Sequence, residues 1–397
     1  MSKLASKQEK QKICVITGTR AEYGLLKRLI KAIEDSKEFH LQLIATGMHL
    51  SKQFGSTYKE IESDGFTIDK KIDIKLDSDT PGGISKSTSL GLVGFSKSLE
   101  ELQPDLVLIL GDRFEILSAA IASMFLRIPI AHLHGGESTE GLIDESIRHS
   151  ITKMSHLHFT ATEQYSKRVI QLGEDPSKVF NVGGTGIENI KKLKLLTKKE
   201  FEKKIKFKFN TKNALVTFHP VTLENKTSKK QFQELLNSVN DLENTNIIFT
   251  KTNSDADGKI INLMIDEYTS KNSDKSIGIT SLGQLNYLSA LKYVDFIIGN
   301  SSSGLLEAPS FKIGTINIGD RQKGRIKAES VVDCLPNKKS IEEAIKIIYS
   351  NNFQNHLKSV KNPYGDGCAS KKIVNVLKSV SLDNILKKAF FNVKFSL

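Results

Sequence analysis

The sequence predicts an α/β protein built from two doubly wound, Rossmann-like domains whose parallel sheets face each other across a cleft. From residue 13 onward, short apolar runs alternate with longer amphipathic stretches, which is the pattern of repeated strand–helix units. A lysine-rich segment interrupts this series near the middle of the chain, and a second series follows it. The length of 397 residues is enough for two or three domains.

The first series is organised around residues 106–149. Leu106–Leu110 is an apolar run that ends at Gly111, as expected of a buried parallel strand, and Asp112 and Arg113 come directly after it. The next apolar run, 128–133, ends in the sequence His-Gly-Gly-Glu. Because ligands bind outside the carboxyl ends of strands in open α/β sheets, we expect these polar side chains to share one edge.

The remaining elements of the first domain follow from the same patterns. Residues 76–83 are expected to form a mobile loop, since they combine Asp, Ser and Thr with Pro and two Gly. Strands are predicted at 13–17, 41–46, 106–110, 128–133, 158–161 and 179–182. Helices are predicted at 21–33, 85–102, 114–126 and 163–172. A further helix is predicted to begin at about residue 51, and another to end at residue 157.

The second series has five predicted strands, and we find no internal repeat between the two halves. Its strands are predicted at 214–218, 246–251, 276–280, 294–298 and 315–318, with helices at 229–242, 258–271, 283–292 and 305–311 and a mainly helical tail after 340. The domain organisation that we predict is an N-terminal tail (1–12), a first Rossmann-like domain (13–186), a linker (187–212), a second Rossmann-like domain (213–365) and a C-terminal helix and tail (366–397).

Composition excludes several classes of function. The net charge of +12 arises mostly from lysine runs, but aromatic residues make up only 7% and no nucleic-acid-binding motif is present, so we expect no nucleic-acid partner. No apolar run approaches the ~18–20 residues that span a bilayer, so we expect no membrane partner. Three cysteines without metal-ligand spacing, Cys14, Cys334 and Cys368, fit a cytoplasmic protein.

Three carboxylates of the first domain are candidates for proton transfer. They are Asp112, Glu137 and Asp144, which lie at or near the ends of the two central strands. A partly desolvated carboxylate can serve as a general acid or base near neutral pH. The alternative is that each carboxylate caps a helix or pairs with Arg113 or Arg148. The spacing of these groups matches no metal motif, so no metal is predicted.

The second domain carries the candidate phosphate site. Gly299–Gly304 joins an apolar strand to a helix with two glycines and three serines, and such turns bind phosphate through backbone N–H groups. A structural helix cap is the alternative. His219 follows the predicted strand 214–218. Arg321 follows the predicted strand 315–318, where it could hold a diphosphate. Neither half has a G-x-G-x-x-G after its first strand, so a nicotinamide cofactor is not supported.

Several motifs, in order, resemble the hydrolysing UDP-N-acetylglucosamine 2-epimerases of sialic acid biosynthesis. The resemblance covers roughly residues 13–370 and implies a GT-B fold, release of UDP and N-acetylmannosamine, no cofactor, and a homodimer or homotetramer. The motifs are ITGTRAEYG (16–24), TGMHLS (46–51), LGDRFE (110–115), HGGE (134–137), DESIRHSITKMSHLHF (144–159), FHPVT (218–222), IGNSSSG (298–304) and INIGDRQKGR (316–325).

The resemblance also implies roles for individual residues. Asp112, Glu137 and Asp144 would be the catalytic carboxylates, joined by His219. The nucleotide would be bound by Arg20, Gly24, Arg113, His219, Asn253, Ser301, Ser302, Glu307 and Arg321, with Asn253 at the uracil and Glu307 at the ribose. One departure is that Gly24 stands where some relatives have serine, so a side-chain contact to phosphate is lost.

Two kinds of alternative remain open at this point. Within the family, the substrate could instead be UDP- or GDP-N,N'-diacetylbacillosamine of the legionaminic acid pathway. Outside it, a GT-B glycosyltransferase would share the nucleotide site but require an acceptor, and a nucleotide-sugar binding protein would not need three carboxylates.

Overall fold

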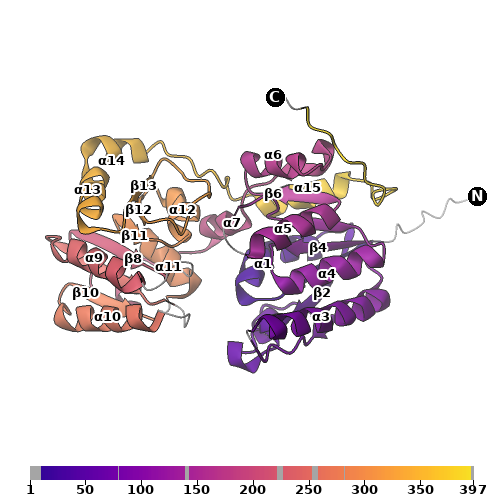
Figure 1. Cartoon of the computed structure of the whole chain (residues 1–397), viewed down its shortest axis with the longest axis horizontal. Helices are drawn as coiled ribbons and strands as arrows, with labels where there is room; N and C mark the ends of the chain where they lie inside the picture. The colour runs from indigo at the N-terminus through magenta and orange to yellow at the C-terminus, as the bar shows by residue number, and fades with distance from the viewer. Residues whose placement is uncertain are drawn as a thin grey trace, which may run out of the picture. The chain divides into compact units, whose positions relative to one another are not determined.

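The structure is a computed structural model that describes residues 10–78, 80–138, 143–220, 227–252, 258–280 and 282–394. The chain forms two compact units (Figure 1). The first consists of Met1–Ser138, Leu142–Asn189 and Tyr364–Leu397, and the second of Thr139–Gly141 and Ile190–Pro363. The chain therefore returns to the first unit after it has completed the second.

The first unit contains a seven-stranded parallel sheet with the order β3-β2-β1-β4-β5-β6-β7. This is a doubly wound order, and its direction reverses between β1 and β4. The strands are β1 (Gln11–Thr17), β2 (Phe39–Thr46), β3 (Lys70–Ile72), β4 (Leu106–Leu110), β5 (Ile130–Leu133), β6 (Leu157–Thr160) and β7 (Val179–Asn181).

Helices cover both faces of this sheet because its strands are apolar on both sides. On one face, alternate strand residues such as Val15 and Leu108 pack against α1 (Arg20–Glu34) and α15 (Ala369–Ser379). On the other face lie α3 (Pro81–Leu102), α4 (Phe114–Phe125) and α5 (Ile143–Met154). The remaining helices are α2 (Tyr58–Ser63), α6 (Glu163–Gln171) and α7 (Thr185–Lys192).

The prediction of a mobile loop over 76–83 is partly wrong, since α3 begins at Pro81. Proline is favoured in the first turn of a helix, and the Thr80 hydroxyl caps this one by accepting a hydrogen bond of 3.1 Å from the N–H of Gly83. The two features that suggested a loop, a threonine and a proline, are here the start signal of a helix.

Two other helix predictions needed correction. The helix expected from about residue 51 is divided into a 3₁₀ turn, Lys52–Phe54, and α2, because Gly55 adopts a left-handed conformation with φ of 87°. The helix expected up to residue 157 ends at Met154, after which the N–H of His156 bonds to the carbonyl of Ile130 and starts β6. The short edge strand β3 was not predicted.

The second unit repeats the same topology with six parallel strands, in the order β10-β9-β8-β11-β12-β13. Together the two sheets confirm the prediction of two Rossmann-like folds. The strands are β8 (Lys212–Thr217), β9 (Thr245–Thr250), β10 (Ser276–Ile279), β11 (Phe296–Gly299), β12 (Gly314–Ile318) and β13 (Val331–Cys334), the last of which was not predicted.

Helices α9 (Ser228–Asn240), α10 (Gly258–Lys271) and α13 (Lys338–Tyr349) form a core with one face of the second sheet. The single helix expected over 305–311 is instead α12 (Ser303–Leu306) followed by a 3₁₀ turn, Ala308–Phe311, since Pro309 cannot continue an α-helix. The other helices are α8 (Lys198–Ile205), α11 (Gly283–Leu291) and α14 (Asn351–Leu357).

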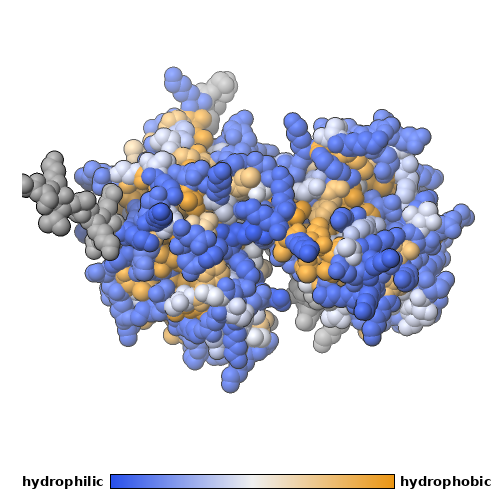
Figure 2. All heavy atoms as spheres, turned by 180° about the vertical axis from the view of Figure 1, so that it is seen from behind, coloured by the Kyte–Doolittle hydropathy of each residue, from blue (hydrophilic) through white to orange (hydrophobic). Residues whose placement is uncertain are grey.

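The surface is mainly hydrophilic on the face shown in Figure 2, where apolar atoms appear in separate areas of both units. This agrees with the 57 basic and 45 acidic residues of the chain. Among the described residues, no helix has the length and apolar character needed to cross a membrane.

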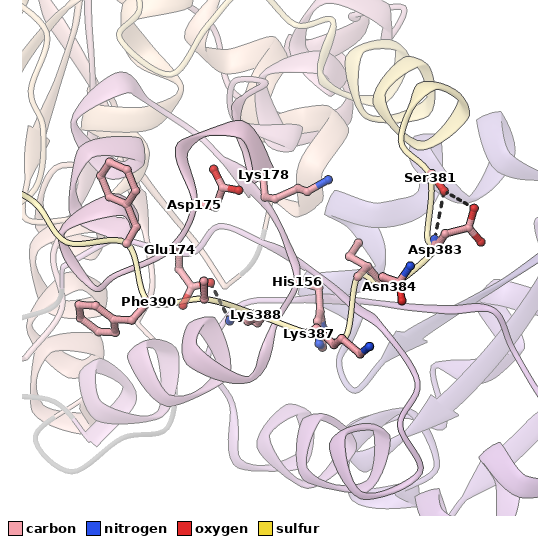
Figure 3. Close-up of a pocket in the computed structure, with 13 residues that line it drawn as sticks. His156, Glu174, Asp175, Lys178, Ser381, Asp383, Asn384, Lys387, Lys388 and Phe390 are labelled. Carbon is pink, nitrogen blue, oxygen red and sulfur yellow. Dashed lines mark hydrogen bonds and ion pairs between the residues drawn. The ribbon is translucent and has the colours of Figure 1, made fainter.

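The segment 381–391, which we call the C-terminal strap, closes the amino edge of the first sheet (Figure 3). The Lys388 ammonium lies 2.6 Å from a carboxylate oxygen of Glu174 and 2.6 Å from the carbonyl of Ser155. Glu174 is 1% exposed and also pairs with Lys153 and His158. A cavity of about 420 Å³ lies between the strap and the sheet.

These contacts keep Glu174 ionised although it is buried. Burial alone would raise the pKa of its carboxyl group, but hydrogen bonds from His158, Lys153 and Lys388 outweigh burial and lower the pKa to about 2. The strap therefore supplies one of the cations that a buried carboxylate of the first unit requires.

We predict that Lys388→Met lowers the free energy of unfolding of the first unit by about 1–3 kcal/mol at pH 7, because Glu174 loses one charged hydrogen bond. Because the pKa of Glu174 in the folded state lies below the usual 4.5, its ionised carboxylate stabilises the folded state above pH 4.5. This stabilisation is lost as the pH falls towards 2. The difference between variant and wild type should therefore shrink between pH 4.5 and 2, as measured by urea denaturation. Lys387→Met is the matched control; an equal loss there would contradict the assignment.

Candidate active site

In both units, the candidate residues lie at the carboxyl ends of the two strands between which the sheet order reverses. In the first unit these are β1, followed by Gly18 and Thr19, and β4, followed by Asp112 and Arg113. In the second they are β8, followed by Phe218 and His219, and β11, followed by Asn300. This is the position at which doubly wound sheets bind ligands.

A buried arginine joins the predicted carboxylates of the first unit. Arg148 of α5 is 2% exposed and forms an ion pair with Asp112 at the end of β4. It also donates hydrogen bonds of 2.9 Å to the Glu145 carboxylate and to the backbone carbonyl of Glu137. The pairing of Asp112 with Arg148, which sequence analysis held open as a structural alternative, thus fixes the direction of the carboxylate.

Glu137 is held in addition by His134. The Nδ1 atom of His134 lies 2.8 Å from Oε1 of Glu137, and its Nε2 atom lies 3.2 Å from the hydroxyl of Thr185 in α7. His134 has a left-handed backbone with φ of 64°, which turns the chain directly after β5. Both side chains are about one-fifth exposed, so the pair is partly open to solvent.

Asp144 is the carboxylate whose environment favours a bound proton. It is the second residue of α5 and is half-buried. Burial, followed by the negative charge of Asp112, raises the pKa of the Asp144 carboxyl group, while Arg148 and Arg113 act in the opposite direction. Asp144 is therefore a candidate for the group that supplies a proton in acid–base chemistry.

His132, which lies in β5 two residues before His134, has a structural role. It is fully buried in β5, and its Nε2 atom lies 2.8 Å from the carbonyl of Gly111. Burial lowers the pKa of His132 to about 3, so the ring is neutral and supports the turn that carries Asp112.

The nucleotide-binding residues predicted for the first unit lie around the start of α1 and α4. Arg20 begins α1, and its Nε atom lies 3.0 Å from Glu60 in an exposed pair. The carbonyl of Gly24 accepts a hydrogen bond of 2.9 Å from Asn189, and no atom lies within 4 Å of an added Cβ, so the serine of some relatives would fit. The Nε atom of Arg113 lies 2.6 Å from Glu115.

In the second unit, Asn300 connects three of the loops at the sheet edge. Its side chain accepts a hydrogen bond of 2.7 Å from the N–H of His219 and donates one of 2.8 Å to the carbonyl of the same residue. Its own carbonyl accepts hydrogen bonds from Arg321, at 3.0 Å, and Gln322, at 2.8 Å. His219 and Arg321, which follow different strands, thus both contact Asn300.

The serine-rich turn lies beside this network. Ser302 occupies the cap position of α12 and makes no side-chain capping bond, while the Ser301 hydroxyl accepts a weak bond from the N–H of Ser303. Glu307 is hydrogen bonded to Ser303, and burial raises the pKa of its carboxyl group. Asn253, predicted to contact the base, lies outside the described residues.

Within the described ranges, no group of three or more His, Cys, Asp or Glu side chains could hold a metal ion. Several polar residues of these edges were not singled out from sequence. Glu22 was recognisable from the spacing Thr-x-x-Glu of a capping box, and Glu115 from its place in the first turn of a helix. The residues missed are Glu22, His49, Glu115, Glu145, Thr185, Asn300 and Gln322.

Two doubly wound units with polar side chains at each point of sheet reversal define a GT-B-like protein. Solved structures agree: the "putative UDP-N-acetylglucosamine 2-epimerase" of Listeria monocytogenes superposes with a TM-score of 0.76 at 21% identity over 94% of this chain and 96% of that one. The Neisseria meningitidis enzyme bound to UDP-GlcNAc gives a TM-score of 0.74 at 21% identity over 93% and 100%.

The sequence model of the UDP-N-acetylglucosamine 2-epimerase family matches residues 31–378, and the chain belongs to this family. It is 46% identical to the GDP/UDP-N,N'-diacetylbacillosamine 2-epimerase (hydrolyzing) of Campylobacter jejuni over 97% of this chain and 100% of that protein. It is 41% identical to the polysialic acid biosynthesis protein P7 of Escherichia coli (96% and 98%) and 38% identical to the UDP-N,N'-diacetylbacillosamine 2-epimerase (hydrolyzing) of Legionella pneumophila (95% and 98%).

We predict that Asn300→Ala lowers the free energy of unfolding of the second unit by about 1–3 kcal/mol, because it removes two buried hydrogen bonds to the backbone of His219. Hydrogen exchange of β8 and β11 in low urea would assign the loss to this unit. Ser302→Ala in the same loop is the control and should change stability by less than ~0.5 kcal/mol. Equal effects of the two substitutions would show that Asn300 does not hold the loop.

Proposed function

We propose that this protein is a hydrolysing 2-epimerase that converts a nucleotide-linked 2-acetamido sugar and water into the nucleoside diphosphate and the free sugar with inverted C2. The observation that carries this proposal is the grouping of Asp112, Glu137 and Asp144 around buried Arg148 at the ligand-binding edge of the first sheet. A binding protein would not need three carboxylates at this edge.

For the substrate, we propose the UDP- or GDP-linked N,N'-diacetylbacillosamine. The relatives from Campylobacter jejuni and Legionella pneumophila carry this sugar in their names, and the former has the higher identity of the three relatives described above. UDP-N-acetylglucosamine, which sequence analysis put first, is the second candidate. It is supported by the more distant Neisseria meningitidis relative of that name, which is 32% identical.

The first chemical step would be elimination. A carboxylate of the Asp112 and Glu137 pair takes the C2 proton while the bond between C1 and the diphosphate oxygen breaks, which leaves a double bond between C1 and C2. Positive groups must stabilise the charge that develops on the departing diphosphate. We assign this role to Arg113, His219 and Arg321, with hydroxyl groups from Ser301 and Ser302.

The second step would be hydration. Asp144, whose pKa is raised by burial, returns a proton to C2 from the opposite face of the ring. Water adds at C1 and gives its proton to Asp144, while the carboxylate that took the C2 proton releases it to solvent or to the departing diphosphate. The sum is one substrate and one water consumed, and one nucleoside diphosphate and one free sugar produced, with no cofactor required.

We further propose that the protein forms a homodimer or homotetramer. Helices α3 and α4 pack against each other on one face of the first sheet (Figure 1) and expose several large apolar side chains. Val93 is 71% exposed and Phe125 is 68% exposed. Large apolar side chains exposed on neighbouring helices are the kind of residue that subunit contacts bury.

Isotope labelling tests the proposed reaction. We expect that incubation with UDP-N,N'-diacetylbacillosamine in deuterated, ¹⁸O-enriched water gives a free sugar with deuterium at C2 and ¹⁸O at C1, as measured by mass spectrometry and NMR. GDP-linked sugar and UDP-N-acetylglucosamine are run in parallel to rank the substrates. Free sugar without label at C2 would exclude the elimination, and turnover only with an added acceptor would identify a glycosyltransferase.

We predict that Asp112→Asn lowers kcat by roughly 10²- to 10⁴-fold, the contribution typical of a general acid or base, while UDP binding is retained. Calorimetry with UDP and the labelling assay measure the two quantities. Asp105→Asn at the opposite end of β4 is the matched control, since the Asp105 carboxylate accepts a hydrogen bond from the N–H of Lys12 and lies away from the proposed site. Loss of UDP binding in Asp112→Asn would indicate a structural role.

A further inference from the structure

A buried carboxylate that no step of the proposed mechanism uses lies beneath Arg113. Glu115, in the first turn of α4, is 1% exposed, and its Oε1 atom accepts a hydrogen bond of 2.6 Å from Nε of Arg113. Its Oε2 atom has no hydrogen-bond partner among the described residues. Burying a carboxylate costs desolvation free energy, which ion pairs and hydrogen bonds must offset.

The backbone of the neighbouring strands is shaped to admit this side chain. A Cβ atom added to Gly18, after β1, would lie 2.8 Å from Cγ and Oε1 of Glu115. Gly47, after β2, has φ of 58°, and a Cβ atom added there would lie 3.3 Å from Oε1. Two glycines that follow adjacent strands therefore leave the space that Glu115 fills, and the position at the start of α4 favours negative charge.

A second buried glutamate is kept from competing for Arg113. Glu22 of α1 is 6% exposed and accepts hydrogen bonds from the N–H groups of Gly18, at 2.7 Å, and Thr19, at 3.2 Å. Burial, and after it the charge of Glu115, raises the pKa of Glu22 to about 8. Near neutral pH, Glu22 is therefore mainly protonated, and Glu115 is the carboxylate that faces the guanidinium.

The contact is directional. Among the described residues, the hydrogen bond from Arg113 to Glu115 uses Nε, and the two terminal nitrogens of the guanidinium can donate to another acceptor. About one-third of the Arg113 side chain is exposed, directly after the strand whose end carries Asp112. Burial opposes the charge of Arg113, but Glu115, through its charge and its hydrogen bond, raises the pKa of the guanidinium above the usual value.

We propose that Glu115 is a positioning residue, which holds Arg113 from beneath so that its terminal nitrogens face the departing diphosphate. This inference rests on the proposed function, because it assigns the anion that Arg113 meets. Glu115 itself contacts no substrate, and its effect on the reaction passes through the arginine.

A double-mutant cycle separates this role from a merely structural one. We expect Glu115→Gln, which keeps the shape but removes the charge, to lower kcat/KM roughly 10- to 100-fold, the loss that corresponds to one charge-assisted hydrogen bond. In the background of Arg113→Met, Glu115→Gln should cause less than a twofold further loss. Glu163→Gln, an exposed first-turn glutamate of α6, is the control and should leave kcat/KM unchanged.

Thermal stability gives a second measurement with an unusual sign. Arg113→Met leaves a buried carboxylate without its cation, so the double variant Arg113→Met with Glu115→Gln should melt at a higher temperature than Arg113→Met alone. Two results would overturn this inference while the proposed function stands. One is an active wild type in which the losses of kcat/KM from the two substitutions are additive, and the other is a double variant that melts at a lower temperature than Arg113→Met. Wild type that neither binds UDP nor releases sugar would overturn the proposed function with it.

Discussion

The ion pair between Arg148 and Asp112 is the interaction on which the catalytic edge depends. A guanidinium is charged at every physiological pH, so burying it in the first unit is favourable only if acceptors surround it. Asp112, Glu145 and the carbonyl of Glu137 supply them, and they come from three separate segments of the chain. The desolvation of one cation thus determines where two of the proposed catalytic carboxylates lie and how they point.

In the second unit, a neutral side chain rather than a charged one holds the loops at the sheet edge together. Asn300 has both an acceptor and a donor in its side chain, and it uses both on the backbone of His219. Its carbonyl accepts from Arg321 and Gln322. A neutral amide in this place orders the loop without adding a negative charge, which suits a site proposed to bind a diphosphate. The two units share a topology but differ in the charge that they gather at the corresponding edge.

The fold was largely predictable because parallel strands buried on both faces are nearly continuous apolar runs, and β4 is the clearest case. Predictions failed where local signals have two meanings, as for the threonine and proline that start α3, or where a strand is short and lies at an edge, as for β3 and β13. The candidate carboxylates and arginines were predicted from their place after strands. The partners that orient them, such as Glu115 and Asn300, depend on contacts between distant segments that no local pattern reports.

The C-terminal strap has a consequence for how the chain reaches its native state. The first unit contains residues that come before and after the second unit in the sequence, and the Lys388 ammonium that pairs with Glu174 is synthesised after the whole second unit. During translation, the second unit can therefore finish folding before the contacts of the first unit are complete. A chain that stops before residue 388 would leave the buried carboxylate of Glu174 without one of its partners.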